Sequence, residues 1–122
     1  MDRLNGHHIL VIEDDYLISA SIVDELIERG ATVVAVSNQR DALKELSNWH
    51  FTAAVVDINL GHGPDFTSAT KLQRERIPFV FITGYDLDML ASAFENVPAL
   101  RKPHDTDQLA EALLSAINLA AA

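Results

Sequence analysis

The sequence predicts an α/β fold: a doubly wound, five-stranded parallel sheet with helices on both faces. Short apolar runs rich in β-branched residues alternate with segments that repeat apolar residues at helical spacing. The runs are apolar at consecutive positions, which is typical of parallel strands covered on both faces. Five such strand–helix units in one chain favour a parallel sheet with crossover helices on either side.

The first unit shows the pattern most clearly. An apolar run within His8–Glu13 is too short for a helix and predicts a central strand. Asp14 or Asp15 could cap the helix that follows, because a side-chain carboxylate can accept hydrogen bonds from the first free backbone N–H groups. This helix is expected to end near Arg29, with Gly30 in the left-handed position that closes many helices.

The same two patterns, consecutive apolar residues for strands and apolar residues at helical spacing for helices, predict the other elements. We expect the second strand at Thr32–Val36, followed by a helix that Ser37 or Asn38 caps and that ends before Trp49. The remaining elements are expected in this order: a strand at Phe51–Asp57, a loop at 58–65, a helix at Phe66–Arg76, a strand at Pro78–Thr83, a short helix at Asp86–Glu95, a strand at Val97–Arg101, a turn at Lys102-Pro103 and a helix at Thr106–Leu119.

Length and composition limit the classes of function. A chain of 122 residues has the length of one typical domain, so a single domain over 1–122 is expected. The net charge of −9 opposes binding to nucleic acid and to anionic lipid. The chain has no cysteine and no apolar run near the ~20 residues that span a bilayer. These features predict a soluble, cytoplasmic protein without disulfides or thiolate metal sites.

Polar groups stand at the ends of four predicted strands. They are Glu13, Asp14 and Asp15 after the first strand, Asp57 at the end of the third, Thr83 at the end of the fourth and Lys102 after the fifth. Because the carboxyl ends of parallel strands open onto one edge of the sheet, we expect these groups to meet there.

Each group also has an ordinary structural explanation. An acidic run after a strand is usually a helix cap and a solvated turn, and Thr83 and Lys102 could be a strand end and a surface lysine. Asp57 is harder to explain in this way, because a carboxylate that ends an apolar strand is partly desolvated and costly without a partner. The histidines His7, His8, His62 and His104 lack the spacing of a zinc pair and are expected in exposed loops, and Trp49 is expected in the core.

Taken together, the groups predict a magnesium site that supports phosphoryl transfer. Two carboxylates about 4 Å apart repel by ~4 kcal/mol at an effective dielectric constant near 20, so the cluster requires positive charge. Mg²⁺ prefers oxygen ligands and tolerates one or two carboxylates together with phosphate oxygens. Lys102 would add a fixed cation, and Asp57 would be the nucleophile that forms an acyl phosphate.

Over residues 8–119 the sequence resembles the response-regulator receiver domains of two-component signalling. The matching positions are Glu13-Asp14 for the acidic pair, Asp57 for the phosphoacceptor, Thr83 for the hydroxyl residue and Lys102-Pro103 for the lysine followed by proline. The resemblance implies a flavodoxin-like fold with strand order 2-1-3-4-5. It also implies phosphorylation of Asp57 by a histidine kinase or a histidine phosphotransfer protein, and signalling through a downstream protein partner or a phosphorelay.

The resemblance also assigns the metal ligands. They would be Asp14, Asp57 and the backbone carbonyl of Asn59, with Glu13 acting partly through water. Asp15 would then be a helix cap rather than a ligand.

Two features depart from the commonest receiver pattern. Ala99 stands three residues before the lysine, where many receivers have a Tyr or Phe whose rotation reports phosphorylation. The stretches Asn59–Pro64 and Pro78–Tyr85 resemble a divergent subgroup of stand-alone receivers. We therefore expect Tyr85 or the helix at Asp86–Glu95 to move in place of the absent aromatic residue.

Two other functions remain open at this stage. An aspartyl-phosphate hydrolase would need an acid two residues after its nucleophile, and this position holds Asn59. A receiver-like adaptor that takes no phosphate is slightly favoured by Ala99, but the acidic pair, Asp57 and Lys102 argue against it. At most, we expect self-phosphorylation and self-dephosphorylation of Asp57 and no turnover of a separate substrate.

Overall fold

The computed structural model describes residues 3–58, 65–84, 94, 96–102 and 106–121. Within this part of the chain there are five strands and four helices. In chain order they are β1 (His8–Ile12), α1 (Tyr16–Glu28), β2 (Thr32–Val36), α2 (Gln39–Asn48), β3 (Ala53–Asp57), α3 (Thr67–Arg74), β4 (Phe79–Thr83), β5 (Ala99–Arg101) and α4 (Thr106–Ala121).

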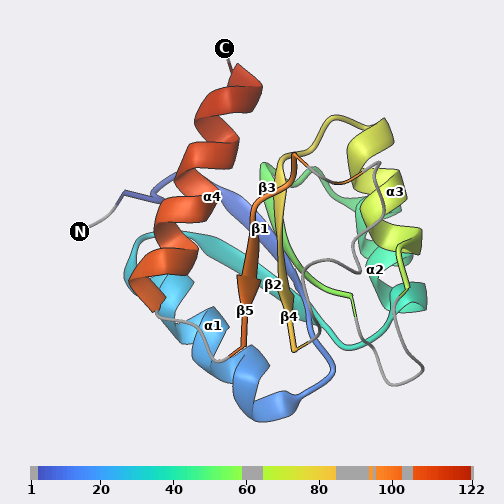
Figure 1. Cartoon of the computed structure of the whole chain (residues 1–122), viewed down its shortest axis with the longest axis horizontal. Coiled ribbons are helices and arrows are strands. Elements are labelled where there is room, and N and C mark those ends of the chain that lie inside the picture. The colour runs from blue at the N-terminus through green and yellow to red at the C-terminus, as the bar shows by residue number, and fades with distance from the viewer. Residues whose placement is uncertain (1–2, 59–64, 85–93, 95, 103–105, 122) are drawn as a thin grey trace.

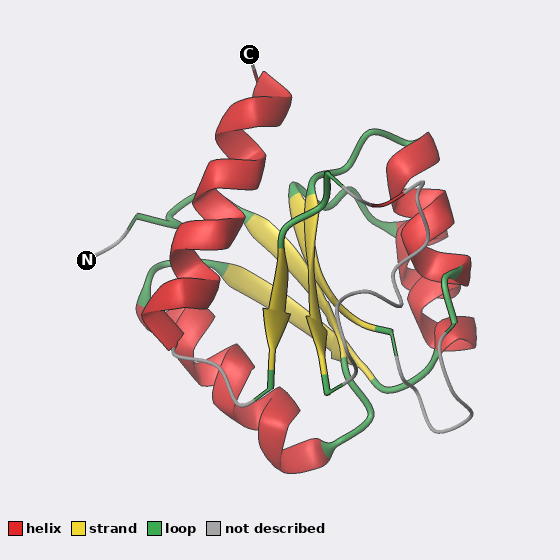
Figure 2. Cartoon of the chain, viewed as in Figure 1, coloured by secondary structure: helices red, strands yellow, loops and turns green. Residues whose placement is uncertain are grey.

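The strands form one parallel sheet in the order β2-β1-β3-β4-β5. This confirms the predicted doubly wound architecture and the strand order 2-1-3-4-5. Helices α1 and α4 pack on one face of the sheet, and α2 and α3 pack on the other (Figure 1). Figure 2 shows the resulting three layers, with the strands between the two pairs of helices.

Alternate residues of each strand supply the two cores. In β1, Ile9 and Val11 pack with α1 and α4, whereas Leu10 and Ile12 pack with α2 and α3. All four side chains are completely buried. The strand is therefore apolar at four consecutive positions, because neither face of the sheet meets water there.

Caps and a left-handed glycine define the ends of the first helices. The Asp15 carboxylate accepts a hydrogen bond from the Ile18 backbone N–H at 3.1 Å, so Asp15 rather than Asp14 caps α1. The side chain of Asn38 caps α2 in the same way. Gly30 has a φ of 100°, which confirms its predicted role after α1.

Several predicted boundaries differ from the observed ones. Strand β3 begins at Ala53 rather than Phe51, and β5 covers only Ala99–Arg101, because Pro98 has no N–H to extend the ladder. Helix α3 stops at Arg74, since Arg76 adopts a left-handed backbone with a φ of 60°. The helix predicted at Asp86–Glu95 lies outside the described residues, apart from Phe94.

Two expectations about aromatic and imidazole side chains were wrong. Trp49 is 61% exposed at the end of α2, where none of the described elements covers the ring. His8 is not a loop residue: it opens β1, and its ring stacks on Phe51 with a centroid distance of 4.3 Å. In the described part of the chain, no helix is both long and apolar enough to cross a bilayer.

A first prediction concerns Gly30 and uses Gly6 as its control. Both have positive φ, but a Cβ on Gly30 would lie 3.1 Å from backbone atoms of Asn5, whereas one on Gly6 would meet nothing within 4 Å. Gly6→Ala should therefore cost ~1 kcal/mol of unfolding free energy from backbone conformation alone. Gly30→Ala should lower the unfolding free energy, measured by urea denaturation, by clearly more than Gly6→Ala does. Equal losses would show that the close approach to Asn5 is unimportant.

Candidate functional site

Four strands bring their polar ends to one edge of the sheet. Glu13 follows β1, Asp57 ends β3, Thr83 ends β4 and Lys102 follows β5. The backbone holds two of these residues beyond the strands themselves. The Lys102 N–H donates to the Thr83 carbonyl at 2.7 Å, and the Glu13 N–H donates to the Val36 carbonyl at 3.0 Å. The strand ladder therefore positions the site.

Three carboxylates gather at this edge. One carboxylate oxygen from each of Glu13, Asp14 and Asp57 lies within 4.8 Å of the others. Glu13 is 2% exposed and Asp57 is 1% exposed, whereas Asp14 is open to solvent. The cluster thus has two buried carboxylates and one exposed carboxylate at its rim.

Lys102 bridges the two buried carboxylates. Its Nζ lies 2.7 Å from Glu13 Oε1 and 2.9 Å from Asp57 Oδ2. Both carboxylates are buried and the Lys102 side chain is 20% exposed, so water screens these contacts less than it would at the surface. Residues 13, 57 and 102, which the sequence placed at one rim, are in direct contact.

The protonation of the cluster reflects its shortage of positive charge. Burial and, after it, the neighbouring Asp57 together raise the pKa of Glu13 from 4.5 to about 7, against the lowering effect of Lys102. Burial lowers the pKa of Lys102, but its contacts with Glu13 and Asp57 outweigh this and leave the pKa raised. Lys102 therefore stays charged, while Glu13 holds a proton more readily than an exposed glutamate does.

The donor set fits a hard divalent cation. Three carboxylates face one ammonium, so two negative charges remain uncompensated when all three are ionised. All donor atoms are oxygens, which Mg²⁺ prefers, and the exposed Asp14 leaves one side open for water or a phosphoryl oxygen. Asp15 does not join the set, because its carboxylate caps α1.

Thr83 lies beside this cluster in the sheet. It is completely buried, and it follows Ile82, the β4 partner of Asp57. Asn59, whose carbonyl was the fourth predicted ligand, lies outside the described residues, as do Pro103 and Tyr85.

Ala99 leaves no aromatic side chain in β5 at the expected switch position. It pairs with Phe81 of β4, and the Phe81 ring makes an edge contact with Phe94 at a centroid distance of 5.6 Å. The aromatic rings near this position therefore come from residues 81 and 94.

Two exposed apolar residues at the start of α1 were not among the predicted site residues. Tyr16 and Leu17 are 81% and 77% exposed. A hollow of about 350 Å³ lies between Tyr16 and the end of β2, lined also by Asp14 and Asp41. The sequence contains one signal for their exposure. Tyr16 and Leu17 lie outside the apolar repeat of α1, which consists of Ile18, Ile22 and Leu26.

Comparison with known sequences matches residues 9–114 to the response regulator receiver domain. The transcriptional regulatory protein TcrA of Mycobacterium tuberculosis is 30% identical over 112 residues, covering 88% of this chain and 44% of TcrA. The sensor protein TorS of Escherichia coli is 34% identical over 89 residues, covering 72% of this chain and 10% of TorS. This chain thus spans less than half the length of either relative.

Solved structures agree with this match. A response regulator receiver protein from Sinorhizobium medicae WSM419 has a TM-score of 0.84 at 27% identity, covering 96% of this chain and 98% of that one. The solution structure of SdrG from Sphingomonas melonis Fr1 has a TM-score of 0.76 at 33% identity, covering 97% and 99%. The chain belongs to the response regulator receiver domain family.

Proposed function

We propose that this chain is a phosphoacceptor: Asp57 receives a phosphoryl group from the phosphohistidine of a histidine kinase or a histidine phosphotransfer protein, in a Mg²⁺-dependent reaction. The observation that carries this proposal is the contact of Lys102 Nζ with both Glu13 and Asp57 at 2.7 and 2.9 Å. A buried nucleophile beside a fixed cation and further carboxylates suits a reaction in which charge on phosphoryl oxygens must be stabilised.

The roles of the side chains follow from their chemistry. An Asp57 carboxylate oxygen attacks phosphorus, the P–N bond of phosphohistidine breaks, and its electron pair stays on the imidazole, so an acyl phosphate forms. The Lys102 ammonium pairs with one phosphoryl oxygen, and the Thr83 hydroxyl donates to another. Glu13, Asp14, Asp57 and the Asn59 carbonyl would hold Mg²⁺, which supplies compensation for the carboxylate and phosphoryl charges when bound.

Signalling would then occur by protein contact, in the cytoplasm. Two relatives are a transcriptional regulatory protein and a sensor protein, which supports a place in two-component signalling. Tyr16 lines a hollow with Glu13 and Asp14, and the exposed Tyr16 and Leu17 offer apolar contact area to a phosphodonor protein. The chain's negative charge supports a protein partner rather than nucleic acid.

The direct test uses a small phosphodonor. Incubation with Mg²⁺ and acetyl phosphate should add one phosphoryl group, detected by intact mass, because the site supplies its own nucleophile and cation. Asp57→Asn should abolish the addition. Asp24→Asn, which removes an exposed carboxylate from α1, should leave it unchanged.

Other outcomes of this assay decide against the proposal. Continuous release of phosphate from added phosphomonoesters would indicate a hydrolase. An unchanged mass, with the protein folded and Mg²⁺ bound, would indicate an adaptor that takes no phosphate.

Substitutions of the neighbouring residues Asp14 and Asp15 distinguish a metal ligand from a helix cap. Asp14→Asn should weaken Mg²⁺ binding roughly tenfold or more in calorimetric titration, since ~1.4 kcal/mol of lost ligand interaction produces that change. Asp15→Asn removes the same charge but keeps a side-chain oxygen that caps helices equally well. It should change the affinity less than threefold. Equal losses would mean that net charge rather than coordination governs binding.

The raised pKa of Glu13 predicts a pH dependence of stability in the metal-free protein. The folded state binds the Glu13 proton more tightly than the unfolded state does, because burial and the neighbouring Asp57 raise the pKa from 4.5 to about 7. The stabilisation is therefore complete below the unfolded pKa and is lost as the pH rises through about 7. The unfolding free energy should fall by on the order of 1–3 kcal/mol across this window relative to Glu13→Gln. Parallel pH profiles for the two proteins would contradict the assignment.

A further inference from the structure

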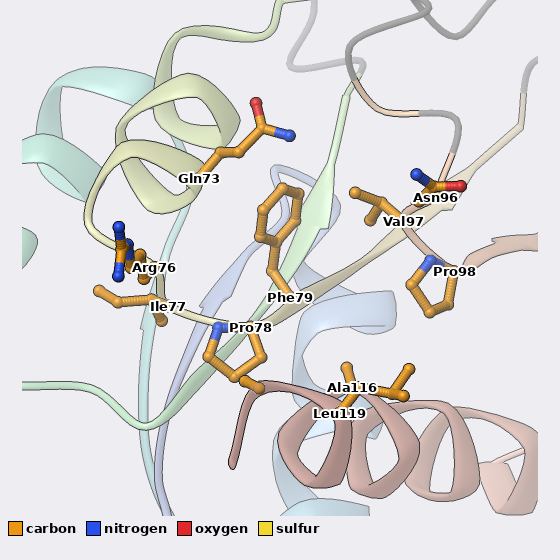
Figure 3. Close-up of a pocket in the computed structure, with 11 residues that line it drawn as sticks. Gln73, Arg76, Ile77, Pro78, Phe79, Asn96, Val97, Pro98, Ala116 and Leu119 are labelled. Atoms are coloured by element: carbon orange, nitrogen blue, oxygen red, sulfur yellow. The ribbon is translucent and has the colours of Figure 1, made fainter. Parts of the chain in front are cut away.

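A cavity of about 370 Å³ lies at the opposite edge of the sheet from Asp57. It opens where β4 and β5 begin, between the last turns of α3 and α4 (Figure 3). The phosphoacceptor chemistry proposed above makes no use of this edge. The volume of the cavity falls at the lower end of the ~300–1,000 Å³ range of small-ligand sites.

The walls of the cavity are mainly apolar. Phe79 of β4 and Val97, just before β5, form one side, and α4 forms the other (Figure 3). The helix presents Ala116 and Ala120 there, whose small side chains leave the space unfilled. Leu119, on the same helix, is 72% exposed at the rim. Apolar surface of this kind is left in water unless something covers it.

One cation lines this apolar space. Arg76 follows α3, where its N–H donates to the Gln73 carbonyl at 3.2 Å and closes the helix. Its φ of 60° is the left-handed conformation that glycine usually occupies at such an end. A side chain at this position costs backbone strain, and Arg76 lines the cavity from an exposed position.

The Arg76 guanidinium has no carboxylate partner among the residues that the structure describes. Arg29 and Lys71, by contrast, are each ion-paired with a glutamate four residues away. The chain has twice as many acidic as basic residues, 18 against 9. An unpaired arginine beside an apolar cavity is therefore an open site for an anion.

We propose that this cavity binds a small apolar carboxylic acid. The carboxylate would accept two parallel hydrogen bonds from Arg76, a geometry that the planar guanidinium matches. The hydrocarbon body would lie against Phe79, Ala116 and Ala120, removing apolar surface from water. Gln73 and Asn96 line the same cavity and add polar groups to its wall.

The test uses octanoate as the probe and amide chemical shifts as the readout, without Mg²⁺ or a phosphodonor. Octanoate should shift the amides of cavity residues saturably, with a dissociation constant of roughly 0.1–5 mM. Arg76→Gln should weaken binding about fivefold. Arg74→Gln removes the same charge from α3 but not from the cavity wall, and it should change binding less than twofold. Octanol, which lacks the charge, should bind several-fold more weakly than octanoate.

A second variant tests the location. Ala120→Leu fills the cavity from an exposed position of α4, so the fold should be preserved and octanoate binding should fall at least fivefold. Shifts that do not saturate, equal binding of octanol, or equal effects of the two arginine variants would each overturn the proposal. Because no phosphodonor is present, failure here is independent of the phosphorylation assay.

Discussion

The Lys102 ammonium lies between two buried carboxylates, and the functional edge of the sheet depends on this charge balance. Glu13 and Asp57 are almost inaccessible to water, so their charges would be costly there without a cation. Lys102 comes from a strand two positions away from β3 in the sheet, and its backbone is held by Thr83. Charge compensation thus depends on the correct alignment of β3, β4 and β5, and the short strand β5 positions the cation.

The two edges of the sheet have different chemistry for a structural reason. The strands β1, β3 and β4 form the middle layer with consecutive buried apolar residues, and their polar residues lie at the strand ends. At the carboxyl ends, the residues that follow are acidic or basic and meet in one cluster. At the amino ends of β4 and β5, prolines and small helix residues leave an apolar hollow beside Arg76. The same three layers therefore support a charged site on one edge and an apolar cavity on the other.

Local patterns in the sequence, namely buried apolar runs and the residues that follow them, were sufficient for the parallel sheet and the grouping of residues 13, 14, 57 and 102. They narrowed each of the first two helix caps to two residues, and the strand order came from the resemblance to receiver domains. The sequence was not sufficient for features set by distant packing. The exposure of Trp49 depends on whether another element packs over the end of α2. The cavity near Arg76 is formed by the ends of elements that are far apart in the chain. The raised pKa of Glu13 likewise depends on burial that no local pattern encodes.

A crystal structure of the protein grown with Mg²⁺ tests the central claim most directly. The account predicts an octahedral ion with ligand distances of ~2.0–2.1 Å, coordinated by Asp14 and Asp57, while Lys102 Nζ stays within ion-pair distance of the carboxylates. An ion bound elsewhere, or a Lys102 side chain turned out to solvent with Asp57 left alone, would contradict it.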